Sequence, residues 1–401
     1  MTSLYLYDDA RARTFEPFAL TRPLGEMRAG MELIRRRWEQ ATVASSARTI
    51  TAPHLVDFEE LDAPPALQGE IDAGAILANT RCVVPLGIEA CDADIWTCDG
   101  RVAAVRAGRG ITLDAFVDGE MPLESLAPSG ARTLEIPGCW LEDVWDFIAQ
   151  LLPQLRADID VVGPRLECIP PDQATVIGSH GVYIERGAIV EPLTCLDVSA
   201  GPVLVRRGAV VRAFTRLVGP CAIAAGATVL GDRIHGCSIG ERSMVHGELS
   251  ETIVLGHANK SHDGFVGHSY MGRWVNLGAG TITSNLKNTY GPVALWTPQG
   301  VRSTGLLKLG TFFGDHVKTG IGLRLTTGSV IGAGSNIYGS VMPPKYVPPF
   351  SWGEGSAIAT YRLDQFLTVA ERVMARREVT LGEGERRKLA AAHARSQEHS
   401  S

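Results

Sequence analysis

The residue of this sequence best suited to chemistry is His262, which heads the stretch HDGFVGHSYMGRWVNLGAGTITSN at residues 262–285. The unperturbed pKa of an imidazole is about 6.5, so the ring is largely neutral near pH 7 and can accept a proton. Transfer of an acyl group from a thioester to an amine needs such a base, together with donors for the oxyanion that develops. His262 is therefore a candidate general base.

Metal binding is the competing use of histidine in this region. Four further histidines lie in or beside the same part of the chain, at His246, His257, His268 and His316. No His-x-His or His-x3-His spacing occurs near residue 262, although such spacings commonly place two imidazoles on one metal. We therefore assign no metal ligand from the sequence.

The elements that must hold His262 are indicated by an apolar residue that recurs at every sixth position. A period of six fits neither an α-helix nor a long strand of period two. It fits a coiled backbone in which each short strand sends one side chain inward and then turns at a glycine. The three series are Ile184, Val190 and Leu196; Val205, Val211, Leu217, Ile223 and Val229; and Phe313, Thr319, Leu325, Ile331 and Ile337. We predict a parallel β-helix of stacked coils over residues 174–352.

The hexads resemble the left-handed β-helix of the hexapeptide-repeat acyltransferases. Residues 262–285 align without a gap on the acetyltransferase half of the bacterial bifunctional N-acetylglucosamine-1-phosphate uridyltransferase / glucosamine-1-phosphate N-acetyltransferase family. The resemblance implies a left-handed coil, acetyl-CoA as the acyl donor and a homotrimer with sites shared between chains. The hand comes from the resemblance alone, because parallel crossovers are normally right-handed.

Individual roles follow from this resemblance. A histidine at the position of His262 is the base in the family, and Glu248 matches the acid that orients or polarises the base or the amine. Asn276 and Asn285 match contacts to an amino-sugar phosphate, and Ala279, in the GAGT corner, matches a backbone contact to the thioester arm. The alternative is structural, since stacked asparagines form ladders in such coils and GAG is a common corner.

Two positions depart from the family pattern. Phe265 stands where the family has a tyrosine, and Ser250 stands where it has a lysine, so a hydroxyl donor and a cation toward the substrate-binding region are lost. Lys260, Arg273 and Lys287 are the nearby cations that would restore the charge an anionic sugar phosphate needs. The reaction type is thus better defined than the acceptor.

Coenzyme A is expected in the groove between adjacent β-helices, as the resemblance implies. The coils from Phe313 to Ile337 extend that groove toward the C-terminus. Asp315, Thr327 and Arg324 are the candidate contacts there, with Arg324 as the cation for the phosphates of the cofactor.

The N-terminal part reads as an α/β domain. Residues 3–7 (SLYLY) are a predicted strand, residues 18–30 a loop, and residues 31–40 an amphipathic helix. This order, and TRPLGEMRAG in particular, resembles the opening of bacterial sugar nucleotidyltransferases. The glycine-rich loop of active members is absent, so backbone amides cannot cradle a triphosphate. Arg22 and Arg28 are the candidate nucleotide contacts, the alternative being a solvated face, and Mg²⁺ is expected only if this domain is active.

We therefore expect an atypical nucleotidyltransferase-like domain at 1–160, ending in an amphipathic helix at 141–160, then the β-helix, then C-terminal helices and a tail at 353–401. One helix is predicted at 356–377 and a charged one at 383–395. An insertion at 287–308 is expected to cover ligand or a neighbouring subunit.

The composition excludes some classes of partner. The 38 basic and 44 acidic residues give a net charge of −6, which predicts no nucleic-acid partner. No run reaches the ~18 apolar residues of a membrane span, and the acidic N-terminus does not resemble a signal peptide. A cytoplasmic protein without a membrane partner follows as the expectation.

Three functions remain open. The first is an acetyl-CoA-dependent N-acetyltransferase on an amino-sugar phosphate of the glucosamine-1-phosphate type, joined to a nucleotidyltransferase domain of the UDP-N-acetylglucosamine diphosphorylase type. The second is an acyltransferase for another amino sugar or one already joined to a nucleotide, which Phe265 and Ser250 favour. The third is a non-catalytic β-helix scaffold with a degenerate nucleotide-binding domain, which the missing glycine loop favours.

Overall fold

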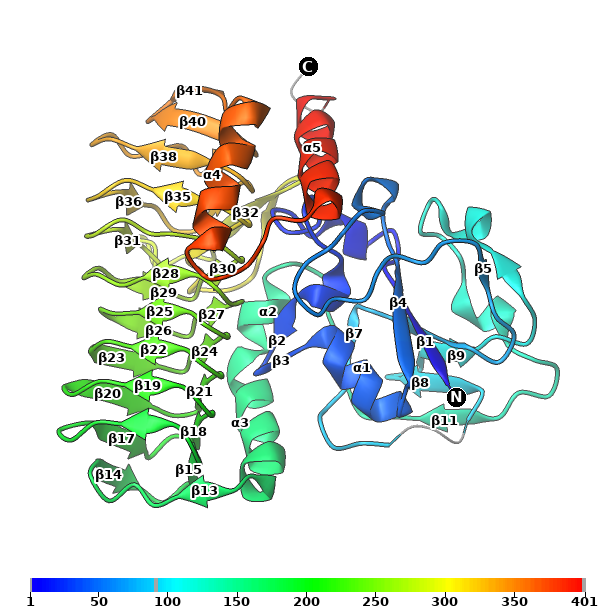
Figure 1. The fold of residues 1–401 in the computed structure, drawn as a ribbon, viewed down its shortest axis with the longest axis horizontal. Coiled ribbons are helices and arrows are strands. Elements are labelled where there is room, and N and C mark those ends of the chain that lie inside the picture. Colours follow the sequence, from blue (N-terminus) through cyan, green and yellow to red (C-terminus); the bar gives the residue numbers. More distant parts are fainter. Residues whose placement is uncertain (1, 90–92, 399–401) are drawn as a thin grey trace. The chain divides into compact units, whose positions relative to one another are not determined.

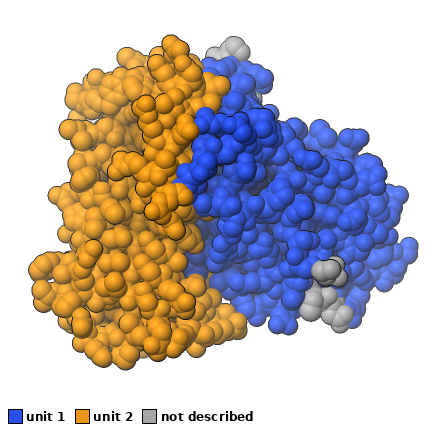
Figure 2. Space-filling view, viewed as in Figure 1, with its two compact units in different colours: residues 1–144, 379–401 blue, residues 145–378 orange. Residues whose placement is uncertain are grey.

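A computed structural model describes residues 2–89 and 93–398, which form two compact units (Figure 2). Residues 1–144 and 379–401 belong to the first unit, and residues 145–378 to the second. None of the helices in the described part of the chain combines the length and apolar composition that a bilayer-spanning segment needs.

The first unit is built on a six-stranded mixed sheet (Figure 1). Its strands, in spatial order, are β11 (Thr133–Glu135), β8 (Ile95–Cys98), β9 (Arg101–Arg106), β6 (Ile76–Asn79), β1 (Ser3–Tyr7) and β4 (Ser46–Ile50). β1 pairs in parallel with β4 and β6, and its residues 4–7 are all buried, as expected for a strand covered on both faces. The predicted first strand and α/β class are confirmed.

Smaller elements complete the first unit. The two-stranded pairs are β2 (Arg28–Ala29) with β3 (Glu32–Leu33), β5 (Glu70–Ile71) with β10 (Ile111–Thr112), and β7 (Cys82–Val83) with β12 (Cys139–Trp140). The helices are α1 (Ile34–Thr42) and, from the other end of the chain, α5 (Glu383–Glu398). In α5, the Lys388 Nζ donates to the Thr21 carbonyl at 3.0 Å, and Arg387 pairs with Asp57 at 2.8 Å. The predicted C-terminal helix thus packs within the first unit.

The second unit is a β-solenoid whose coils each add a strand to the faces of a prism (Figure 1). The first sheet comprises β13 (Cys168–Ile169), β15 (Val182–Glu185), β18 (Val203–Val205), β21 (Cys221–Ile223), β24 (Ser238–Ile239), β27 (Ile253–Val254), β30 (Tyr270–Met271), β34 (Thr311–Phe313), β37 (Ser329–Ile331) and β39 (Tyr346–Val347). All its neighbouring pairs are parallel except β13 with β15.

The second sheet comprises β14 (Thr175–Gly178), β17 (Cys195–Val198), β20 (Thr215–Val218), β23 (Asp232–His235), β26 (Leu249–Ser250) and β29 (Val266–Gly267), followed by the pair β31 (Ile282–Thr283) and β36 (Arg324–Leu325). The third comprises β16 (Ile189–Val190), β19 (Val210–Val211), β22 (Thr228–Val229), β25 (Met244–Val245) and β28 (Asn259–Lys260), then β35 (Lys318–Thr319), β38 (Asn336–Tyr338), β40 (Ser351–Glu354) and β41 (Ala357–Thr360). Bridges from Asn259 to Asn276 and from Asn276 to Lys318 join its two parts.

The interior of the prism is filled by the hexad residues that the sequence places inward. Leu196, Val205, Leu217, Ile223 and Val229 all belong to one buried apolar cluster. The predicted parallel coil is confirmed, because one inward side chain per short strand supplies this cluster and the backbone groups pair with the coils above and below.

The predicted helices differ in extent from those observed. Residues 141–160 contain α2 (Asp146–Ala149) and most of α3 (Leu151–Val162), which belong to the second unit, where Phe147 contacts Tyr270 with ring centroids 5.2 Å apart. Residues 357–360 pair as β41 with β40, so the helix expected at 356–377 is only α4 (Leu363–Ala375). The insertion at 287–308 contains the hairpin β32 (Ala294–Thr297) and β33 (Gly300–Ser303).

Candidate functional site

His262 lies exposed at the corner that follows β28, where two cavities of the second unit adjoin. Ser261 and His262 line both of them. One cavity has a volume of about 680 Å³ and the other about 670 Å³. An imidazole in this position can be approached by two different reactants.

The first cavity runs over the corners of consecutive coils. Ala279 and Gly280 line it from one coil, and Ile321 and Gly322 from the next. The amide of Gly322 donates to the Ala279 carbonyl at 2.7 Å, and Gly280 and Gly322 have φ of +71° and +69°, a conformation in which glycine avoids Cβ strain. These small residues keep the groove open beside His262, and they bring the predicted residue Ala279 to the same cavity.

Lys260, predicted as a contact to the substrate, does not face the first cavity. It is 2% exposed and stands in register with Val245, at an inward position of the third sheet. Its Nζ donates to the carbonyls of His246 and His262 at 2.7 and 2.5 Å. The lysine therefore fixes the corner that carries His262, and its contact with a sugar phosphate stays a prediction.

Burial of Lys260 gives a prediction for stability. Desolvation lowers its pKa to about 8, against about 10.4 in an unfolded chain. Below pH 8 both states are protonated, whereas between pH 8 and about 10.4 the unfolded state binds more protons, so the free energy of unfolding rises with pH. Relative to Lys260→Met, the wild-type protein should gain up to ~3 kcal/mol over this window in urea unfolding experiments.

The surface variant Lys287→Met, which also removes one lysine, is the control for this experiment. A pH-independent difference between wild type and Lys260→Met would contradict the buried position of the lysine.

One group of possible metal ligands occurs among the described residues, beside His262. Atoms of Asp232, His246 and Asp263 lie within 4.8 Å of one another, with His246 Nε2 3.5 Å from Asp232 and Nδ1 3.2 Å from Asp263. Both carboxylates act on the Lys260 ammonium and oppose the lowering of its pKa. The lysine thus already supplies a cation to this group, which disfavours a metal ion there.

Asn276 lines the second cavity together with His262. Its Oδ1 accepts a hydrogen bond of 2.9 Å from Asn259 Nδ2, in the next coil. The asparagine ladder considered as the structural alternative is therefore present, and the same side chain borders the candidate site.

Glu248 and Phe265 directly precede β26 and β29, and Asn285 lies two residues after β31. None of the three lines either cavity. A Cβ built on Gly267 would meet the Phe265 ring at 2.4 Å and Asn285 Nδ2 at 2.8 Å, so these two predicted residues lie close together. Asn285 contacts His268 Nδ1 at 2.8 Å. Glu248 pairs with Arg233 at 3.2 Å.

The predicted cofactor contacts are dispersed. Asp315 is 2% exposed, and its Oδ1 accepts a hydrogen bond of 2.8 Å from the amide of Arg273, so the carboxylate serves the backbone of the coil. Arg324 is exposed and donates to the Ser340 carbonyl at 3.3 Å. Lys287, predicted for the substrate, donates to the Pro292 carbonyl at 2.5 Å.

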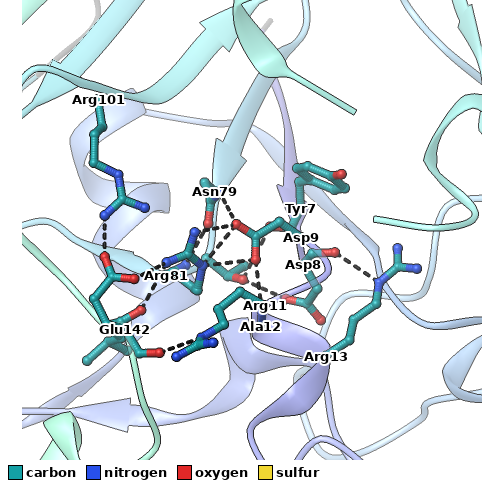
Figure 3. A network of polar contacts seen from close by, with 12 residues as sticks. Tyr7, Asp8, Asp9, Arg11, Ala12, Arg13, Asn79, Arg81, Arg101 and Glu142 are labelled. Carbon is teal, nitrogen blue, oxygen red and sulfur yellow. Dashed lines mark hydrogen bonds and ion pairs between the residues drawn. The ribbon is translucent and has the colours of Figure 1, made fainter. Parts of the chain in front are cut away.

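In the first unit, two carboxylates follow β1 at the carboxyl end of the parallel strands, where α/β sheets commonly bind ligands (Figure 3). Asp9 accepts hydrogen bonds from Arg81 at 2.7 to 2.9 Å and from Asn79 at 2.9 Å. Burial opposes ionisation of Asp9, but the bonds and charge of Arg81 outweigh it and lower its pKa.

Asp8 is enclosed by donors. Its carboxylate accepts hydrogen bonds from Thr80 at 2.6 Å, Thr51 at 2.7 Å and the Leu24 amide at 3.2 Å. Burial raises its pKa to about 6. Since Asp8 is buried and Asp9 is held by Arg81, these two carboxylates do not fit a Mg²⁺ site, which needs accessible oxygen ligands.

The candidate nucleotide contacts Arg22 and Arg28 are each 1% exposed. Arg22 pairs with Glu60 at 2.9 Å, and Arg28 donates to the Met31 carbonyl. Both side chains are thus engaged inside the domain, and their contact with a nucleotide stays a prediction.

Sequence reasoning missed three cations that border the second cavity: Lys318, Arg376 and Arg377. Lys318 directly precedes Thr319, an inward residue of the hexad series. Because side chains alternate between the two faces of a strand, the position of Lys318 could be recognised as outward-facing. The two arginines follow the last turn of α4, where cations are common because they interact favourably with the C-terminal end of a helix.

Comparison with known proteins finds similarity to sugar-nucleotide enzymes in parts of the chain. Residues 4–164 match the family model described as sugar nucleotidyl transferase. The bifunctional sugar-1-phosphate nucleotidylyltransferase/acetyltransferase of Sulfurisphaera tokodaii is 36% identical over 91 residues, 23% of each chain. The bifunctional protein GlmU of Bartonella quintana is 29% identical over 217 residues, 53% of this chain and 43% of its own.

The matched regions span less than half the length of these relatives. The chain therefore carries a sugar nucleotidyl transferase domain at its N-terminal end, followed by a β-solenoid, and is similar to bifunctional nucleotidyltransferase/acetyltransferases.

Proposed function

We propose that the second unit is an acetyl-CoA-dependent N-acetyltransferase acting on an amino-sugar phosphate, with His262 as the general base. The observation that carries this proposal is the exposed imidazole at the junction of two cavities, one along the Ala279 corner and one bordered by cations. Two reactants can thus meet at one base. The similarity to proteins named acetyltransferases supports the same reaction.

Acetyl-CoA supplies the acetyl thioester in this reaction. His262 takes the proton that the acceptor amine loses as its nitrogen bonds to the acetyl carbon, and it returns a proton to the sulfur as the C–S bond breaks. Lys260 holds the His262 carbonyl and so limits the movement of the base. The groove at Ala279 and Gly280 is the place proposed for the thioester arm.

A series of acceptors tests the substrate class. Release of free thiol from acetyl-CoA should be faster with glucosamine-1-phosphate than with glucosamine, because a phosphate offers charge-assisted contacts that the free sugar lacks. A UDP-linked amino sugar is the third acceptor. A clear preference for that compound would favour the alternative acyltransferase, and no thiol release with any amine would favour the scaffold.

Nucleotidyl transfer is the second candidate activity, and the family match of residues 4–164 favours it. The missing glycine loop and the engaged state of Asp8 and Asp9 weigh against it. Pyrophosphate release by the full-length protein from UTP or dTTP with a sugar 1-phosphate and Mg²⁺ tests this activity. Detectable release would establish nucleotidyl transfer and, together with acetyl transfer, a bifunctional enzyme of sugar-nucleotide biosynthesis.

The remaining expectations concern assembly and location. A homotrimer follows from the family resemblance, and light scattering of the full-length protein measures its mass directly. The cytoplasmic location stays a prediction.

A further inference from the structure

The second cavity at His262 has an unusual balance of charge. Of the residues described along its wall, three are lysine or arginine, Lys318, Arg376 and Arg377, and none is aspartate or glutamate. Asn276 and His262 contribute polar groups to the same cavity. A volume of about 670 Å³ holds a small phosphorylated molecule rather than a single ion.

Lys318 lies on the third sheet, and one N–H group of its ammonium has no acceptor among the described residues. It is half-buried, and its Nζ donates to the carbonyls of Trp274 and His316 at 2.8 and 2.9 Å. An ammonium has three N–H donors, so one remains after these two bonds. Burial lowers the pKa of Lys318 to about 7, and a bound anion would favour its charged form.

The two arginines lie next to each other just after α4. Arg377 donates to the Arg242 carbonyl at 3.3 Å, and burial, followed by the charge of Arg376, lowers its pKa. Arg376 is exposed and forms no ion pair with a carboxylate among residues 2–89 and 93–398. The C-terminal end of a helix attracts cations by a fraction of a charge only. Two adjacent guanidinium groups that form no ion pair with a carboxylate of the described residues therefore favour an anionic ligand.

The three nearby cations considered for an anionic substrate are occupied elsewhere. Arg273 is 4% exposed, and its Nη1 lies 3.2 Å from His257 Nδ1. Lys260 is held by the carbonyls of His246 and His262, and Lys287 by that of Pro292. Ser250 carries no charge. A phosphorylated substrate of the base would thus need cations from another element.

We propose that Lys318, Arg376 and Arg377 form a phosphoryl-binding site that holds a phosphorylated substrate beside His262. This inference rests on the proposed function for its location, and it names the phosphate as the recognised group. The phosphate can belong to the amino-sugar acceptor or to coenzyme A, since both offer the same tetrahedral anion to a guanidinium.

Calorimetry on the full-length protein tests the site without requiring acetyl transfer. The ligands are glucosamine-1-phosphate, glucosamine, coenzyme A and pantetheine, and the variants are Arg376→Ala, Arg377→Ala and the double variant. Arg372→Ala is the matched control, because it removes an arginine of α4 that does not line the cavity.

The double variant should bind one phosphorylated ligand at least tenfold more weakly than the control, with no change for the unphosphorylated partner of that ligand. Loss confined to glucosamine-1-phosphate assigns the site to the acceptor, and loss confined to coenzyme A assigns it to the donor. Equal affinities of the double variant and Arg372→Ala for both phosphorylated ligands would overturn the proposal.

Two further measurements keep the test independent of folding and of catalysis. Lys318→Met should weaken binding of the same ligand. The affinity of wild type for that ligand should fall as NaCl is raised from about 0.05 to 0.3 M, because salt screens exposed charges. Salt-independent binding by wild type would count against the site. A protein that binds the phosphate in this manner but transfers no acetyl group would refute the proposed function alone.

Discussion

Replacing His262 by alanine is expected to lower the rate of acetyl transfer about 10²- to 10⁴-fold, the usual contribution of a positioned general base. The side chain is exposed at the junction of the two cavities, so its removal leaves the solenoid interior unchanged. Thiol release from acetyl-CoA at saturating acceptor measures the effect. The affinity for both substrates should change much less than the rate.

His180→Ala is the control, since this histidine is also exposed and belongs to the second unit. Added imidazole should restore part of the activity of His262→Ala, because the open cavities admit a free base. An unchanged rate in His262→Ala would remove His262 from the mechanism.

The largest expected effect on stability comes from Arg81, at the carboxyl end of the first unit's sheet (Figure 3). Its side chain is 9% exposed and binds Asp9, itself 16% exposed, at 2.7 Å. Arg81→Met leaves the partly buried carboxylate without its cation, which typically costs about 3–5 kcal/mol. Urea unfolding monitored at pH 7 measures the loss.

The effect of Arg81→Met should depend on pH in a defined direction. The pKa of Asp9 is lowered in the folded protein, so its stabilising contribution is present above the unfolded value of about 3.9 and is lost as the pH falls through the folded value. The difference between wild type and variant should therefore shrink in acid. Arg101→Met is the control, because its pair with Glu142 is 43% and 52% exposed and should matter by less than about 1 kcal/mol.

The coil of the second unit could be predicted because its inward residues repeat at a fixed spacing. Val205, Val211, Leu217 and Ile223 are six apart in the sequence and lie in one buried cluster. Thr319 fits the same series although it is polar, because its hydroxyl bonds the Gly278 amide and Thr281. A repeat fixes both the face and the neighbours of each such residue.

The roles of cations could not be predicted in the same way. Lys260 occupies an inward position, yet coils between Val229 and Lys260 advance by 16 and 15 residues, so counting by six fails there. Burial of its ammonium is possible only because two corner carbonyls meet it, and such contacts leave no periodic signal. The buried contacts of Arg22 and Arg28 leave no periodic signal either.

The compact units do not follow chain order. Residues 141–160 follow β12 of the first unit in the sequence, but α3 packs on the solenoid beside β21, whereas α5, at the far end of the chain, packs in the first unit. Short amphipathic helices show which face is apolar but not which surface will cover it.

The most direct test of the central claim follows the acetyl group itself. Wild-type protein is mixed with glucosamine-1-phosphate and acetyl-CoA carrying ¹³C at the thioester carbonyl, and the carbon spectrum is recorded over time. We predict that the thioester signal is replaced by that of an amide on the sugar, with one thiol released for each amide formed. A thioester signal that persists, or that gives only free acetate, would contradict acetyl transfer to an amino-sugar phosphate.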